Sequence, residues 1–144
     1  AGLSMGGYGA FKIALSYPER FAAAASLSGV LDIQLAVEKN KEDPDPRFPL
    51  PMGLAFGNPI NVTDTPDDIP WLLKKINNQK TKPRLYQCCG SEDDLYANNL
   101  RIRELIQTLD FDYTYEESAG DHNWVYWDTN IKNVLNWLPL EQFE

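Results

Sequence analysis

The sequence predicts an α/β fold in which a parallel sheet carries flanking helices and the first strands are missing. Segments with helical and strand patterns follow one another in the order helix, strand, long loop, strand, helix, strand, helix, and this alternation is typical of a parallel sheet. A turn of the kind that follows a buried strand stands at the first residues, with no room for a strand before it. The 144 residues, 43% of them hydrophobic, suffice for one core. We therefore expect residues 1–144 to be the C-terminal portion of a single domain in a longer protein.

The first predicted elements are a helix and a short strand. Met5–Tyr17 has helical spacing of its apolar residues, and Pro18 ends it because a residue before proline is pushed out of the α region. Phe21–Leu27 is rich in alanine, which favours helix. Its brevity, and its place between a helix stop and Ser28-Gly29, favour instead a parallel strand buried on both faces.

Val30–Pro83 is a long connection that we expect to be irregular. Lys39–Pro51 carries four prolines among charges and predicts an exposed loop, and a short helix is expected around Pro70–Asn77. Long loops inside compact domains are often functional, so this one is expected to cover a substrate pocket. Covering the core is an equally good alternative for its apolar residues. The candidate lining residues are Met52, Leu54 and Phe56.

The last third of the chain predicts two strands and two helices. Arg84–Cys89 is a buried strand, Leu95–Leu109 an amphipathic helix, and Phe111–Glu117 an alternating strand with one wetter face. A final helix follows. Its expected apolar stripe consists of Trp127, Ile131, Val134, Leu135 and Leu138.

Charge and cysteine content exclude several classes of function. The formal net charge of −8 argues against a nucleic-acid or anionic-membrane partner, and no apolar run is long enough to span a bilayer. Cys88 and Cys89 are adjacent, so in a strand they point to opposite faces and are poor disulfide partners. We interpret them as buried structural thiols, which is compatible with a reducing compartment.

Gly2-Leu3-Ser4-Met5-Gly6 reads G-x-S-x-G, the strand-to-helix turn that exposes a serine hydroxyl at the top of a parallel sheet. A Cβ at either glycine should collide with the neighbouring strand or helix, and Gly7 should let helix and sheet approach closely. The N–H groups at the start of the following helix point to where an oxyanion would develop. The alternative is that Ser4 is only a helix cap.

Three polar residues follow three expected parallel strands, where such sheets bind ligands. They are Ser4, Asp93 and His122. Their order, serine then acid then histidine, is the one used by the α/β-hydrolase fold, and His122 is the single histidine able to serve as the base. Each has a plain alternative: a surface histidine, or a serine or aspartate capping a helix. The joint arrangement favours a catalytic triad.

The identity of the acid is less constrained than that of the other two residues. Glu92, Asp93 and Asp94 are consecutive, so their side chains diverge and at most one faces the histidine well. We take Asp93 as the acid and Asp94 as the alternative. Asp121 adjoins His122 and is poorly placed to reach its Nδ1.

Several stretches resemble one family closely. Gly2–Ala10 resembles the nucleophile turn of the esterase D-like branch of α/β-hydrolases, the family of tributyrin esterase, S-formylglutathione hydrolase and feruloyl esterase modules. Tyr17–Phe21 resembles the segment that follows. Cys89–Tyr96 resembles the acid loop, which places the acid at Asp93, and Gly120–Trp124 resembles the histidine loop.

The resemblance runs nearly end to end and is weakest across Asp32–Pro83. It implies the C-terminal part of an α/β-hydrolase fold without the N-terminal half, which in the family carries the second oxyanion donor. It also implies a serine esterase acting on small acyl esters or thioesters, with neither metal nor cofactor. The Met5 N–H would be one oxyanion donor, and Trp124 joins the candidate substrate-binding residues. The chain alone is expected to be a poor enzyme.

Two other functions and one structural consequence remain open. An acyltransferase of the same fold, or a non-catalytic binding module, would share these features. The Phe21–Leu27 strand, without its preceding neighbour, would have a bare apolar edge, which proteins rarely leave exposed. We expect the missing half, another copy of the chain or a swapped segment to cover it.

Overall fold

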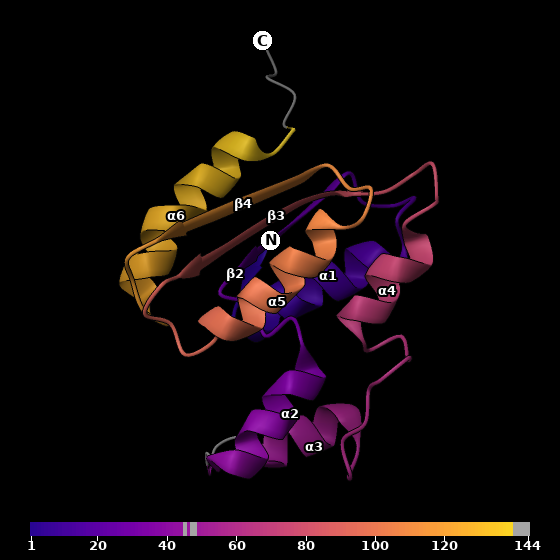
Figure 1. Cartoon of the computed structure of the whole chain (residues 1–144). Helices are drawn as coiled ribbons and strands as arrows, with labels where there is room; N and C mark the ends of the chain where they lie inside the picture. The colour runs from indigo at the N-terminus through magenta and orange to yellow at the C-terminus, as the bar shows by residue number, and fades with distance from the viewer. Residues whose placement is uncertain (45, 47–48, 140–144) are drawn as a thin grey trace.

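The computed structural model of the chain describes residues 1–44, 46 and 49–139. Its centre is a parallel sheet in the order β1-β2-β3-β4, which is also the order along the chain (Figure 1). The strands are β1 (Gly2–Leu3), β2 (Ala23–Leu27), β3 (Arg84–Gly90) and β4 (Tyr113–Ser118). Helices connect successive strands, so the predicted α/β fold with a parallel sheet is confirmed.

Helices cover both faces of the sheet (Figure 1). α1 (Met5–Ser16), α4 (Ile69–Ile76) and α5 (Tyr96–Gln107) lie on one face, and α6 (Trp124–Trp137) lies on the other. Successive strand residues serve the two layers in turn: Leu85 packs with the first group of helices, whereas Tyr86 packs with α6. This alternation follows from the two-residue period of a strand and gives the molecule a core on each side.

The predicted loop over Lys39–Pro51 is wrong at both ends. α2 (Ile33–Glu42) continues through its first part, and α3 (Pro49–Phe56) begins before its last residue. The Asp32 carboxylate starts α2 by accepting a hydrogen bond from Leu35 N at 2.9 Å. Prolines stand in the first turn of α3, where the lack of an N–H costs no helical hydrogen bond. Of the predicted loop, Asp45, Arg47 and Phe48 lie outside the described residues.

The other predicted elements are confirmed to within one or two residues, with two differences. A two-residue strand, β1, exists at the start of the chain, where the sequence had suggested no room for one. In α6, Trp127 and Val134 are buried as expected, but Leu135 is 53% exposed. The buried stripe of α6 passes through Asn130 instead, because residues at spacings of three and four share one face of a helix.

β2 is only partly covered on its outer side. β1 pairs with Ser26 and Leu27, and among the described residues no strand pairs with Ala23–Ala25 on that side. A hollow of about 400 Å³ lies there between α1 and β2. Its lining includes Ala10, Ile13, Phe21, Ala23 and Ala24.

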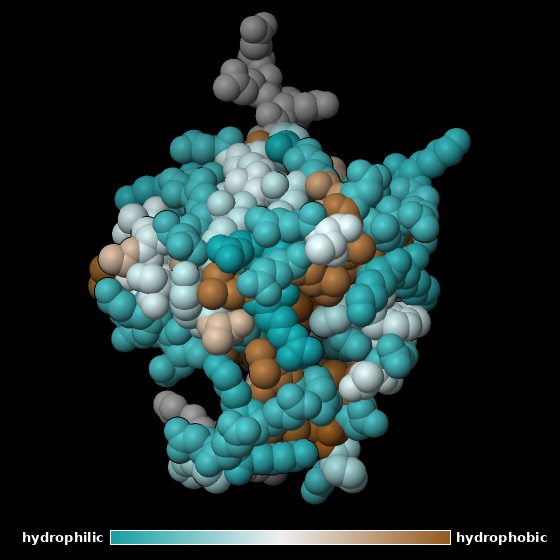
Figure 2. Space-filling model, viewed as in Figure 1, coloured by the Kyte–Doolittle hydropathy of each residue, from teal (hydrophilic) through white to brown (hydrophobic). Residues whose placement is uncertain are grey.

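The face of the molecule shown in Figure 2 is mainly polar. In the view of Figure 2 most of it is hydrophilic, with hydrophobic residues showing near α4 and where α2 and α3 meet the rest of the molecule. None of the helices in the described ranges has the length and apolar character needed to cross a membrane.

Candidate active site

Ser4 occupies a strained turn between β1 and α1. Its φ of 52° lies in the left-handed region, which non-glycine residues rarely adopt. Ser4 N donates to Leu27 O at 3.0 Å, while Gly7 N and Tyr8 N donate to Ser4 O. The side chain makes no cap hydrogen bond to α1. The backbone is therefore held at both ends and the hydroxyl is free to point elsewhere, which disfavours the helix-cap alternative.

The glycines around Ser4 differ in whether a larger residue would fit in their place. A Cβ on Gly2 would lie 2.2 Å from Gly6 O, and one on Gly7 would lie 2.5 Å from Ser26 Oγ. Both positions therefore need glycine for the close approach of α1 to the sheet. The expected collision at Gly6 is wrong, because a Cβ there meets nothing within 4 Å.

The acid loop and the histidine loop lie against each other at the ends of β3 and β4. Ser91 N donates to Ser118 O at 3.0 Å, and Glu92 N donates to Gly120 O at 3.0 Å. A Cβ on Gly90 would lie 2.1 Å from Gly120 O, so a larger residue there would push the loops apart. This contact brings Asp93 and His122 together.

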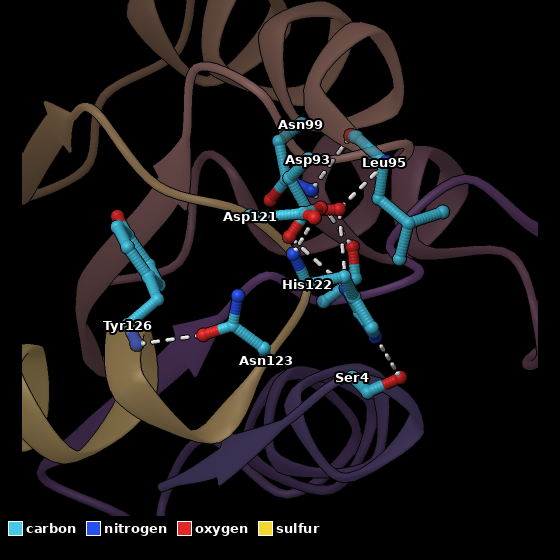
Figure 3. A network of polar contacts seen from close by, with 9 residues as sticks. Ser4, Asp93, Leu95, Asn99, Asp121, His122, Asn123 and Tyr126 are labelled. Carbon is cyan, nitrogen blue, oxygen red and sulfur yellow. Dashed lines mark hydrogen bonds and ion pairs between the residues drawn. The ribbon is translucent and has the colours of Figure 1, made fainter.

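His122 bridges Asp93 and Ser4 (Figure 3). Its Nε2 lies 3.0 Å from Ser4 Oγ, and its Nδ1 lies 3.0 Å from Asp93 Oδ2 and 3.1 Å from Oδ1. Asp121 Oδ1 accepts a hydrogen bond from His122 N at 2.6 Å, and Asn123 caps α6 by accepting from Tyr126 N. These two contacts hold the loop that presents the imidazole.

Asp93 is prepared to remain ionised beside the imidazole. Burial by itself raises the pKa of Asp93, but the hydrogen bonds from His122 and from the Leu95 N–H, together with the influence of the Ser28 hydroxyl, outweigh it and lower the pKa below its ordinary value. Leu95 N donates to Asp93 Oδ1 at 2.8 Å. An ionised Asp93 accepts the Nδ1–H of the neutral imidazole and leaves Nε2 as the acceptor that faces Ser4. The arrangement can take a proton from the serine hydroxyl.

This geometry occurs in a chain that matches a known family. The family model described as "Putative esterase" matches residues 1–138. The chain belongs to this esterase family. Its sequence is 30% identical over 140 residues to an acetyl esterase of Caldicellulosiruptor saccharolyticus, and the match covers 95% of this chain and 52% of that protein.

Two solved structures from Staphylococcus aureus resemble this esterase-family chain in both sequence and fold. One is FphF, a fluorophosphonate-binding serine hydrolase, with 34% identity and a TM-score of 0.76 over 94% of this chain and 51% of that one. The other is the S-formylglutathione hydrolase FrmB, with 33% identity and a TM-score of 0.74 over 94% of this chain and 52% of that one. The chain therefore spans about half the length of the relatives that it matches. The predicted resemblance to the esterase D-like family is confirmed.

The alternative acids of this esterase-family chain lie elsewhere. Glu92 and Asp94 are exposed on either side of Asp93, which is 4% exposed, and Asp121 contacts the backbone of His122. Of the four, Asp93 is the one whose carboxylate reaches the imidazole Nδ1.

The candidate pocket residues have varied surroundings. Met52 is buried in the main core, and the Phe56 ring packs edge-on against Tyr8 with centroids 5.6 Å apart. These positions match the alternative that the connection covers the core. Leu54 is 80% exposed. Trp124 lines an apolar hollow of about 190 Å³ together with residues of β1 and β2.

Met5 is the first residue of α1. Its N–H is one of those that a helix leaves without an internal partner, and it immediately follows Ser4. A donor at this place is suited to an oxyanion. No group of three or more metal-ligating side chains occurs in the part of the chain that the structure describes.

Sequence reasoning missed two neighbours of the Ser4, His122 and Asp93 cluster. Trp127, expected only as part of an apolar stripe, also packs edge-on against His122 with ring centroids 4.9 Å apart. Ser28, fully buried directly after β2, helps to lower the pKa of Asp93. The rule that identified Asp93 and His122, a polar residue just after a parallel strand, applies equally to Ser28 and could have found it.

Proposed function

We propose that this chain carries the catalytic triad of a serine esterase that hydrolyses small acyl esters or thioesters. The observation that carries the proposal is the continuous contact from Ser4 Oγ through the two ring nitrogens of His122 to Asp93. A serine is a weak nucleophile unless an oriented base accepts its proton. In this chain the base, its orienting acid and the serine stand in the required order.

The reaction follows from the roles of these groups. Ser4 Oγ attacks the acyl carbonyl while His122 Nε2 takes its proton, and the Met5 N–H donates to the developing oxyanion. The imidazolium then protonates the departing alcohol or thiol, which leaves an acyl group on Ser4. Water attacks this acyl-enzyme with His122 again as base, and the bond to Ser4 Oγ then breaks as the imidazolium returns the proton to Oγ and the carboxylic acid leaves. Asp93 holds the imidazole tautomer and stabilises the imidazolium throughout.

The substrate class rests on the relatives. An acetyl esterase and an S-formylglutathione hydrolase both act, by name, on small acyl groups, one carried on oxygen and one on sulfur. The triad suits either, because the same attack and proton transfer release an alcohol or a thiol. We infer a small acyl group as the common feature. We propose no particular alcohol or thiol as the leaving group.

The oxyanion site is expected to need a further donor. The described residues offer the Met5 N–H beside Ser4, whereas such sites commonly combine two donors. The relatives are about twice as long as this chain. We therefore propose that a second donor is supplied by polypeptide outside these 144 residues.

The test is covalent labelling of Ser4 by a fluorophosphonate in the longest natural polypeptide that contains this chain. Intact-mass measurement should show one adduct per molecule, and peptide mapping should place it on Ser4. Ser4→Ala should remove the adduct, and His122→Gln should slow its formation. The matched control Ser16→Ala, which changes a serine at the end of α1, should label like the wild type. A folded protein that forms no adduct would contradict the esterase and favour a binding module.

A further inference from the structure

Each of the four parallel strands in the described structure ends near a polar residue of the same cluster. β1 leads to Ser4, β3 to Asp93 and β4 to His122, while β2 leads directly to Ser28. The φ of Ser28 is 49°, close to the 52° of Ser4. Such backbone strain in a residue other than glycine is often found at functional sites. Ser28 is also completely buried, so its hydroxyl is out of contact with solvent.

Hydrogen bonds join the backbone around Ser28 to β3, which precedes the Asp93 loop, and to α5, which follows it. Ser28 N donates to Cys88 O at 2.8 Å, in the strand before Asp93. Asn99, in the helix after Asp93, donates through Nδ2 to Gly29 O at 3.0 Å and is itself fully buried. The turn that carries Ser28 and the loop that carries Asp93 are therefore held in one relative position.

Asn98 adds a second tie to the same helix. Its Nδ2 donates to Asp32 O at 2.8 Å, and its Oδ1 accepts from Asp32 N at 3.0 Å. Both partners are nearly completely buried, where paired hydrogen bonds are strongly preferred over unpaired groups. Residues 28–32 thus have no freedom to move away from the acid loop without breaking buried hydrogen bonds.

The Ser28 hydroxyl lies among the groups that surround the acid. Its oxygen is buried and makes no hydrogen bond in the structure, so it is an unpaired polar group in the turn that Cys88 O and Asn99 hold beside the acid loop. The hydroxyl also helps to lower the pKa of Asp93. It also acts on Cys89, whose pKa burial raises to about 12. A neutral thiol is a weak acceptor and an ionised carboxylate a strong one. The Ser28 hydroxyl is therefore expected to rotate so that it donates to the Asp93 carboxylate rather than to the Cys89 thiol.

We propose that Ser28 is a positioning residue, whose hydroxyl donates to the Asp93 carboxylate and keeps it turned toward His122 Nδ1. The inference rests on the proposed function, because it assigns Ser28 to the same triad. Ser28 has no contact with the reacting atoms. It acts through Asp93, in addition to the Leu95 N–H that already binds Oδ1.

The single histidine of the chain allows a test that needs no turnover. In ¹⁵N-labelled protein at neutral pH, the His122 Nδ1–H proton should resonate far downfield because it is donated to Asp93. Ser28→Ala removes the hydroxyl and keeps the backbone strain, whereas Ser28→Gly removes the hydroxyl and relieves the strain. Both variants should move this signal upfield or broaden it through exchange with water. Ser26→Ala is the matched control, since Ser26 lies two residues earlier in β2, is equally buried, and its hydroxyl also lacks a partner.

Acid titration of the same signal gives a second readout. The variants should lose the signal at a higher pH than the wild type, because the Ser28 hydroxyl helps to lower the pKa of Asp93. The neighbouring ionisable groups, Cys89 and Asp121, are the same in every variant. Fluorophosphonate labelling of Ser4 should also slow by about tenfold or more, the size expected for one hydrogen bond to a charged group.

The outcomes separate this inference from the proposed function. An unchanged Nδ1–H signal in both Ser28 variants, an equal change in Ser26→Ala, or a change confined to Ser28→Ala would overturn the role of the hydroxyl. A wild type that shows the downfield signal and its loss in the Ser28 variants, but takes no fluorophosphonate, would support the positioning contact and contradict the esterase.

Discussion

His122 Nε2 lies 3.0 Å from Ser4 Oγ, although 118 positions of sequence separate the two residues. The parallel sheet produces this contact, because its strands run in one direction and their carboxyl ends meet at one edge. β2 and β3 stand between the strands that carry the two residues. The loops after β3 and β4 therefore have to reach back across the sheet edge, and Gly90 and Gly120 allow them to do so.

The ionised Asp93 should stabilise the fold except in acid. Its pKa lies below the ordinary value of 3.8, so its contribution is complete above the unfolded-state value and is lost as the pH falls through the lower folded-state value. The free energy of unfolding in urea should therefore favour the wild type over Asp93→Asn at about pH 6, and this difference should shrink below about pH 4.

The matched control for this measurement is Asp94→Asn, which changes the exposed neighbour. It should alter the free energy of unfolding by no more than about 0.5 kcal/mol. A difference between wild type and Asp93→Asn that stays constant from neutral to acid pH would contradict the inferred ionisation.

Residues 1–144 alone should hydrolyse p-nitrophenyl acetate poorly. Lack of one oxyanion donor typically costs about 2.7–4 kcal/mol of transition-state stabilisation, a factor of about 10²–10³ in rate. Turnover by the isolated chain should therefore be lower by at least this factor than turnover by the longest natural polypeptide that contains it. The Ser4→Ala variant of each serves as the blank. Comparable turnover by the two proteins, abolished in both by Ser4→Ala, would show that no further donor is needed.

Cys88 and Cys89 should be unreactive while the chain is folded. Burial is the main cause that raises the pKa of each thiol, to about 12 in both cases, and the thiolate is the reactive form. Iodoacetamide at about pH 8 should leave the folded chain unmodified and add two groups after unfolding, as read by mass spectrometry. Rapid modification of either cysteine in the folded chain would disagree with its buried place in β3.

Two adjacent residues of α6 should differ sharply in their effect on stability. Val134 is fully buried and Leu135 is 53% exposed. Val134→Ala should lower the free energy of unfolding by about 2 kcal/mol through lost burial and a small cavity. Leu135→Ala should change it by about 0.5 kcal/mol or less. Equal effects in urea unfolding would mean that the buried stripe of α6 is placed incorrectly.

The uncovered edge of β2 should make the purified chain self-associate, because another copy is the only partner present in such a solution. Unpaired strand edges with apolar surroundings favour pairing with a further strand. The variant Ile13→Lys with Phe21→Lys places charges in the adjoining hollow and should sediment as a monomer. Leu135→Lys, a similarly exposed change on α6, should behave like the wild type. A monomeric wild type at high concentration would refute this expectation.

Local patterns predicted much of this molecule. The strand Phe111–Glu117 was predicted from its alternation of apolar and polar residues, and Arg84–Cys89 from a short run that ends in Gly90 and polar residues. Proline content failed as a guide over Lys39–Pro51, since prolines favour a loop on average, but Pro49 and Pro51 lie in the first turn of α3, where they cost no helical hydrogen bond. The resemblance of Cys89–Tyr96 to the family's acid loop favoured Asp93 over its acidic neighbours. In the folded chain Asp93 is buried whereas these neighbours are exposed.

The sequence by itself determined the order of the elements apart from β1, α2 and α3, the serine turn, and His122 as the candidate base, because these depend on residues close together in the chain and on there being one histidine. Only the tertiary structure decided that Met52 faces the core, that Leu135 faces away from it, and that Ser28 joins the surroundings of Asp93. The reason is that a local pattern shows which residues can be buried, whereas packing between distant segments decides which side chains meet.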